Sequence, residues 1–158
     1  MGAGDVQHAA KIPLDGRSPG LASTHCADRV DAGSRRVKAL VEEKTGCCFD
    51  SLSLNLYRDH RDSIHWHNDR EHEGLWSFPI ASVSFGAVRR FKWMSGKDGT
   101  TTQPLAHGSL LVMPPGFQGD YVHALLKQTR ACGPRINLTF RRRATEWKKG
   151  YRAFGRKK

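Results

Sequence analysis

From residue 51 onward, apolar and polar residues alternate in a series of short segments. Between residues 51 and 57 every second residue is a leucine, so the leucines share one face of an extended chain and polar residues share the other. Turn-forming residues interrupt the pattern at 95–99 and 114–116. Further segments of strand length lie at residues 64–67, 80–85, 90–94, 109–113, 121–125 and 136–140. The pattern predicts that strands dominate the chain after residue 50.

The residues before this region predict little regular structure except one helix. Residues 1–32 mix Gly, Pro, Asp and Ala without the period of a strand or a helix, and we expect them to be irregular or disordered. Ser34 can cap a helix over residues 34–44 whose apolar positions share one face, and Gly46 is placed to end it. The sequence therefore predicts one helix ahead of the strands.

The basic residues are concentrated near the C-terminus. The chain has 26 Lys and Arg against 15 Asp and Glu, a net charge of +11, and residues 142–158 carry +7 of it. A basic segment interleaved with aromatic residues favours a polyanionic partner such as nucleic acid, and a solvated end that only aids solubility is the alternative. We divide the chain into an N-terminal segment 1–32, a domain 33–143 and a basic tail 144–158.

The sequence indicates neither a membrane span nor a disulfide framework. The longest uniformly apolar run, residues 110–113, is far shorter than the roughly 20 residues of a transmembrane helix. The four cysteines form neither a CxxC pair nor an evenly spaced framework, so we interpret them as reduced thiols. We expect an intracellular protein, nuclear or cytoplasmic, with no membrane partner.

A possible metal site begins with His67 and Asp69, which are two residues apart. In an extended chain such residues point to the same side. His123, on another predicted strand, can supply a third ligand. Two histidines and one carboxylate form the facial triad of non-haem Fe(II) oxygenases, which leaves coordination positions open for a co-substrate and O₂.

A zinc site is the alternative use of the same region. His65 and His67 are also two residues apart, and His60 or His72 could complete the ligand set. No feature further along the chain requires this arrangement.

The iron interpretation requires a cation elsewhere in the chain. If iron binds 2-oxoglutarate, a cation must hold the far carboxylate of that co-substrate. The last predicted strand places two arginines at the ends of one polar face, which carries Arg135, Asn137, Thr139 and Arg141. Asn55 and Tyr57 add a donor pair on the polar face of the first strand. The sequence thus meets two independent requirements of an Fe(II) and 2-oxoglutarate site.

Five segments together resemble the successive core motifs of the AlkB family of Fe(II)/2-oxoglutarate-dependent dioxygenases, in its nucleic-acid dealkylase branch. They are NLYRD at 55–59, residues 62–69, residues 79–86, residues 105–111, and PRINLTFR at 134–141. The resemblance runs from about residue 35 to 143. It implies a mainly β (α+β) fold, a double-stranded β-helix or jelly roll with one flanking helix. Relatives carry a nucleotide-recognition lid ahead of the core, but residues 1–33 contain no Phe, Tyr or Trp. We expect either a shortened N-terminal region without this lid or a base-binding surface that is built otherwise.

The resemblance also implies roles for individual residues. The iron ligands are His67, Asp69 and His123, and the residues that bind 2-oxoglutarate are Asn55, Tyr57, Arg135, Asn137, Thr139 and Arg141. Arg135, helped by Tyr57, holds the distal carboxylate, while Asn55 and Arg141 lie nearer the metal-bound end. Glu71 falls where relatives place a carboxylate beside the exocyclic amine of the target base, although a surface role is the alternative. His107 is expected to be a packing and turn residue.

The implied activity is the oxidative dealkylation of N-alkylated nucleobases in DNA or RNA. Fe(II), 2-oxoglutarate and O₂ are consumed in a reaction that releases formaldehyde, succinate and CO₂. The expected partner is a single-stranded nucleic acid or a flipped base, bound by a monomer. The alternatives are a dioxygenase acting on a protein or small molecule, and a catalytically impaired relative that only binds nucleic acid.

Overall fold

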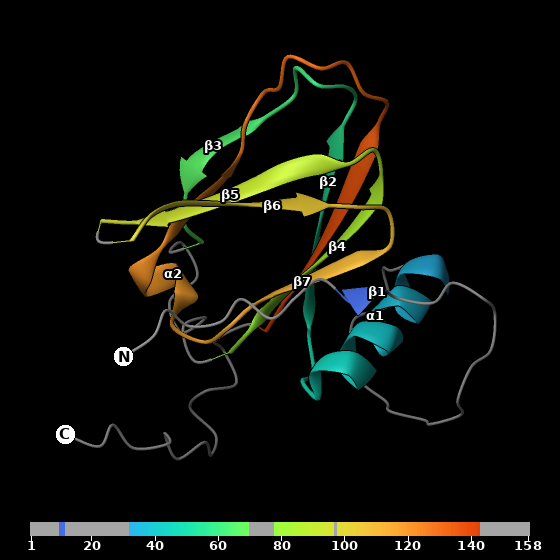
Figure 1. Cartoon of the computed structure of the whole chain (residues 1–158). Helices are drawn as coiled ribbons and strands as arrows, with labels where there is room; N and C mark the ends of the chain where they lie inside the picture. Colours follow the sequence, from blue (N-terminus) through green and yellow to red (C-terminus); the bar gives the residue numbers. More distant parts are fainter. Residues whose placement is uncertain (1–9, 12–31, 70–77, 97, 143–158) are drawn as a thin grey trace.

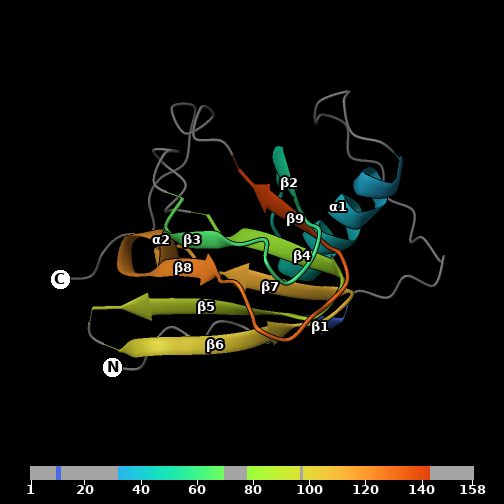
Figure 2. The same cartoon turned by 90° about the horizontal axis from the view of Figure 1, so that it is seen from above.

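Two antiparallel sheets face each other in a computed structural model that describes residues 10–11, 32–69, 78–96 and 98–142 (Figures 1 and 2). One sheet has the strand order β1-β7-β4-β9-β2 and the other β3-β8-β5-β6. The elements are β1 (Ala10–Lys11), α1 (Ala32–Thr45), β2 (Ser51–Tyr57), β3 (Ile64–His67), β4 (Ile80–Gly86), β5 (Arg89–Ser95), β6 (Gly99–Leu105), β7 (Ser109–Met113), α2 (Phe117–Asp120), β8 (Val122–Leu125) and β9 (Arg135–Arg141). This is the predicted jelly roll.

The helix α1 packs on the outer face of the five-stranded sheet. Its apolar side chains meet a cluster that contains Val41, Phe49, Leu138 and Phe140, all nearly removed from solvent. Gly46 ends the helix at a φ of 65°, and its N–H donates to a carbonyl of the last turn. The helix begins two residues earlier than predicted, so Ser34 lies in its first turn and is not the capping residue. No helix in the described ranges is long and apolar enough to cross a membrane.

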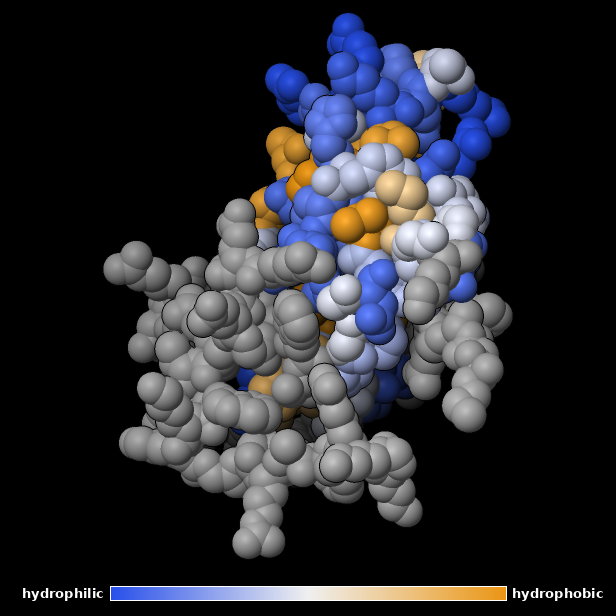
Figure 3. Space-filling model, turned by 90° about the vertical axis from the view of Figure 1, so that its left-hand side faces the viewer, coloured by the Kyte–Doolittle hydropathy of each residue, from blue (hydrophilic) through white to orange (hydrophobic). Residues whose placement is uncertain are grey.

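The polar faces of β2 and β9 point into the sandwich. Strand β9 turns Leu138 towards α1, whereas Asn137 and Thr139 are buried on the opposite face. In β2 the leucines are on the outer face, and Leu54 and Leu56 keep 59% and 58% of their surface exposed. Apolar residues also reach the surface in small patches on the side of the molecule seen in Figure 3. The polar residues of these strands therefore line the interior, where they build the site.

Three elements were not predicted from the sequence. Strand β6 pairs only with β5 at the edge of its sheet, and its threonines are exposed, so it shows no apolar alternation. Helix α2 has only four residues and follows Gly116, which adopts a φ of 87°. Strand β1 lies in the segment expected to be irregular and pairs with β7. The thiols of Cys47, Cys48 and Cys132 are free, as expected, whereas Cys26 lies outside the described residues.

Gly86 joins two strands at a point where only glycine fits. Its φ is 90°, and a Cβ there would collide with the carbonyl oxygen of Pro134. We expect Gly86→Ala to cost more than the roughly 1–2 kcal/mol of a left-handed non-glycine residue, because a clash with backbone is added. The free energy of unfolding from urea denaturation measures this cost. Gly46→Ala is the matched control, since its φ is also positive but its Cβ would meet no atom within 4 Å. Equal losses in the two variants would contradict the account.

Candidate functional site

Three potential metal ligands meet where β3 and β8 pair. The register aligns His67 with His123, and their ring centroids are 4.3 Å apart. Asp69 follows β3, and one ligand atom from each of the three residues lies within 4.8 Å of the others. Among the residues that the structure describes, neither His60 nor His65 joins this group. The fourth histidine of the zinc alternative, His72, lies outside the described residues.

Hydrogen bonds orient two of these side chains. His67 Nδ1 lies 2.7 Å from the carbonyl oxygen of His65, so the ring can donate there and leave Nε2 for a metal ion. The backbone N–H of Asp69 donates to Gln118 Oε1 at 3.0 Å, which connects the loop to α2. Arg141 donates to Asp69 Oδ2 through Nε at 3.0 Å and Nη2 at 2.8 Å. Asp69 Oδ1 remains on the side of His67 Nε2, at 3.9 Å.

The imidazole of His123 is suited to metal binding because it is held neutral. Its exposed fraction is 5%, and its Nδ1 has no hydrogen-bond partner among the described residues. Burial, with repulsion from His67, lowers the pKa of His123 to about 4. The ring is therefore neutral at physiological pH, and neutral imidazole is the form that coordinates metals. Two imidazoles and one carboxylate fit Fe(II) and leave coordination positions open.

Arg135 is a buried cation that lacks a carboxylate partner among the described residues. Only 2% of its surface is exposed, and its Nη2 donates to Ser84 Oγ at 2.8 Å and Asn137 Oδ1 at 2.9 Å. Its Nε and Nη1 have no partner in the described part of the chain. Burial lowers the pKa of Arg135 to about 10, which leaves it charged at neutral pH. A buried guanidinium with free donors is a site for an anion.

A small polar network fixes the position of Arg135. Asn137 Oδ1 also accepts from Ser82 Oγ at 2.9 Å, and Asn137 Nδ2 donates to Thr139 Oγ1 at 2.7 Å. Asn137 thus accepts from Arg135 and is itself held by Ser82 and Thr139, and all four residues line the pocket. Ser82 and Ser84 were not identified as site residues from the sequence. Their signal was two serines at alternate positions of an otherwise apolar strand, which marks a polar inward face.

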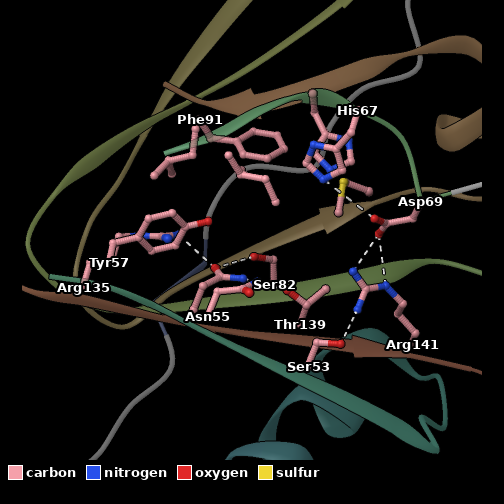
Figure 4. A pocket seen from close by; sticks show the side chains of 15 residues that line it. Ser53, Asn55, Tyr57, His67, Asp69, Ser82, Phe91, Arg135, Thr139 and Arg141 are labelled. Atoms are coloured by element: carbon pink, nitrogen blue, oxygen red, sulfur yellow. Dashed lines mark hydrogen bonds and ion pairs between the residues drawn. The ribbon is translucent and has the colours of Figure 1, made fainter. Parts of the chain in front are cut away.

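One cavity of about 270 Å³ joins the metal ligands to Arg135. In Figure 4, His67 and Asp69 lie at one end, and Tyr57 and Arg135 lie at the other. Its volume is just below the roughly 300–1,000 Å³ of typical ligand pockets, which suits a small co-substrate. The predicted site residues that line it are Asn55, Tyr57, His67, Asp69, His123, Arg135, Asn137, Thr139 and Arg141. Glu71 lies outside the described residues.

His107, which was expected to be a packing and turn residue and not a ligand, contacts the end of β4. Its Nδ1 accepts a hydrogen bond from the backbone N–H of Gly86 at 3.0 Å, and its ring meets Phe85 edge-on. It is absent from the ligand group found among the described residues.

A jelly roll whose cavity combines an Fe(II)-compatible ligand set with an anion site is typical of one class of metal-dependent oxygenases. Residues 19–141 match the family model described as the 2OG-Fe(II) oxygenase superfamily. The chain belongs to this superfamily, whose name specifies Fe(II) and 2-oxoglutarate, and O₂ is the third reactant.

The chain is also similar to individual AlkB-type proteins. It is 42% identical over 118 residues to human alpha-ketoglutarate-dependent dioxygenase alkB homolog 3, which covers 68% of this chain and 41% of the relative. It is 42% identical over 117 residues to mouse DNA oxidative demethylase ALKBH2, covering 68% of this chain and 48% of the relative. The matched region thus spans less than half the length of these relatives.

A solved structure supports the fold independently. The structure of OsALKBH1 superposes with a TM-score of 0.57 and 16% sequence identity, and the match covers 68% of this chain and 65% of that chain. At this level of identity the likeness concerns the fold alone.

Proposed function

We propose that the chain is an Fe(II)- and 2-oxoglutarate-dependent dioxygenase that removes alkyl groups from N-alkylated nucleobases in DNA or RNA. The observation that carries the proposal is one cavity that brings together three potential metal ligands and a buried guanidinium, two of whose nitrogens have no partner among the described residues. A dicarboxylate that bridges these two ends would satisfy both. The names of the relatives support the choice of substrate.

Each residue of the cavity has a task in this proposal. His67, Asp69 and His123 hold the iron, and Arg141 holds the carboxylate of Asp69 in place. Arg135 and Tyr57 bind the distal carboxylate of 2-oxoglutarate. The other polar lining residues, Asn55, Asn137 and Thr139, support the same co-substrate. Iron held by these ligands would supply the activation of O₂. An N-methyl group hydroxylated in this way leaves the base as formaldehyde.

The proposed substrate is a base outside the duplex stack. An alkyl group on a pairing edge is inaccessible within a duplex, so the strand is single or the base is flipped. The net charge of +11 favours binding to phosphates, chiefly through the basic tail. We propose Glu71 as the residue beside the exocyclic amine of the base, and a monomeric protein in the nucleus or cytoplasm.

A second candidate is a dioxygenase with a protein or small-molecule substrate. The observation in its favour is the distribution of charge. Because residues 142–158 carry +7, the rest of the chain carries only +4, which is a modest charge for a domain that binds a polyanion.

Formaldehyde release distinguishes the two candidates. The protein is incubated with Fe(II), ascorbate, 2-oxoglutarate and a single-stranded oligonucleotide that carries N-methylated bases, with the unmethylated strand alongside. We expect formaldehyde and succinate in equal amounts from the methylated strand only. Asp69→Ala is the inactive control, and His65→Ala should be close to the wild type because His65 is exposed and outside the ligand group. Succinate without demethylation would contradict the nucleic-acid assignment and favour the second candidate.

A further inference from the structure

Arg89, the first residue of β5, is a second buried arginine outside the predicted site. Only 1% of its surface is exposed, and it is among the largest fully buried side chains. No carboxylate in the described part of the chain pairs with it. A buried charge without a counter-ion is costly unless hydrogen bonds satisfy it. Its presence therefore requires an explanation.

The guanidinium of Arg89 donates to three backbone carbonyls in two segments, the β2–β3 connection and the residue after β8. Nη1 donates to the carbonyl oxygen of Asp59 at 2.9 Å, and Nη2 donates to those of Asp62 at 2.8 Å and Leu126 at 2.9 Å. Asp59 and Asp62 lie between β2 and β3, and Leu126 directly follows β8. Tyr57 ends β2, Ile64 begins β3 and Leu125 ends β8, and all three line the cavity. One side chain thus ties together the strand ends on the Tyr57 side of the site, whereas His67 and His123 pair towards the other end of β3 and β8.

The charge of Arg89 also reaches the anion site. Its Cζ lies 5.7 Å from the centroid of the Tyr57 ring, and the Cζ of Arg135 lies 5.1 Å from the same centroid. Burial is the largest cause of the lowered pKa of Arg135, and repulsion from Arg89 lowers it further. Two buried positive charges at one aromatic ring are stabilised by an anion that binds between or beside them.

We propose that Arg89 is a positioning residue of the co-substrate pocket. It fixes Tyr57, and it supplies a second buried positive charge that favours dicarboxylate over monocarboxylate ligands. Arg135 contacts the ligand. Arg89 acts indirectly, through its contact with the Tyr57 ring and through the electrostatic attraction between its charge and the ligand. The proposal rests on 2-oxoglutarate being the ligand of this cavity, as in the proposed function, but not on the identity of the oxidised substrate.

A purely structural role predicts a different behaviour. If Arg89 only satisfied three carbonyls, its loss would lower stability and leave ligand preference unchanged. The decisive quantity is thus the ratio of affinities for 2-oxoglutarate and 2-oxobutyrate, a 2-oxo acid that lacks the distal carboxylate. Both can be titrated calorimetrically into the protein loaded with Mn(II), without O₂ chemistry or nucleic acid.

We expect Arg89→Gln to reduce this ratio by about 5- to 30-fold, as loss of a nearby charge in a partly buried site would do. Arg89→Lys keeps the charge and should retain the ratio to within about threefold, even if it melts at a lower temperature. Val41→Ala is the matched control, because Val41 is fully buried in the cluster under α1 and does not line the cavity. It should lose stability with no change in ratio.

Two results would overturn the proposal. One is an unchanged ratio in a folded Arg89→Gln variant, and the other is a ratio lost in a folded Arg89→Lys variant. Should Arg89→Gln fail to fold, Arg89→Met takes its place as the neutral variant, because only loss of the charge separates the proposal from a purely structural role. Absence of formaldehyde release by the wild type would contradict the proposed nucleic-acid substrate and leave this binding result intact.

Discussion

Replacing His123 with alanine is expected to abolish 2-oxoglutarate turnover while the protein remains folded. An open three-ligand site has no spare ligand, so the loss should exceed the roughly 10- to 100-fold that removal of an outer partner costs. The fold should survive because the alanine removes a side chain that borders a cavity and leaves the β3 and β8 pairing intact. Succinate formation and iron retained after desalting are the measurements, with the circular dichroism spectrum as a check of the fold.

The same loss is expected for His67→Ala and Asp69→Ala, and His65→Ala is the control. His65 is exposed and lends only its carbonyl oxygen to His67, so its side chain should be dispensable. A His123→Ala variant that kept iron and near-normal turnover would mean that the third ligand lies elsewhere. His107 would then be the next residue to test.

Arg135→Ala is expected to raise the apparent KM for 2-oxoglutarate by about 10- to 150-fold. The estimate corresponds to roughly 1.5–3 kcal/mol for a lost charge-assisted hydrogen bond. Iron binding should be almost unchanged because Arg135 lies at the opposite end of the cavity from His67 and Asp69 (Figure 4). Steady-state succinate formation at varied 2-oxoglutarate, together with an iron titration, measures both quantities.

Arg135→Lys separates charge from geometry at this position. Lysine keeps the positive charge but lacks the planar fork that also bonds Ser84 and Asn137, so we expect an intermediate KM. A normal KM in the alanine variant would show that another group anchors the distal carboxylate. Loss of iron together with 2-oxoglutarate affinity would indicate a general collapse of the cavity.

The period-two pattern predicted most of the fold because side chains in a strand alternate between two environments. The polar faces of β2 and β9 were identifiable from Asn55, Tyr57 and the series from Arg135 to Arg141. Periodicity alone did not reveal that the polar face is the one that lines the cavity. The leucines of β2 look like core residues in the sequence, yet Leu54 and Leu56 are largely exposed. A polar interior suits the charged ligand that we propose for this cavity.

The contacts that sequence analysis could not predict join residues far apart in the chain. Gln118 reaches the backbone of Asp69 from a four-residue helix that has no periodicity. Arg141 was expected near the metal-bound end of 2-oxoglutarate, and the structure adds that its side chain holds Asp69. Arg89 was not identified from the sequence, and only the fold shows that it is buried.

The central claim is that the metal ion and 2-oxoglutarate bind in one cavity and contact each other there. Calorimetry should give the 2-oxoglutarate affinity with and without Mn(II), and the Mn(II) affinity with and without 2-oxoglutarate. We expect each ligand to tighten the other by the same factor, of about 10-fold or more, as linkage requires. The coupling should vanish in Asp69→Ala, which removes a metal ligand and leaves Arg135 in place. A coupling factor of one in the wild type, with both ligands binding, would contradict the account.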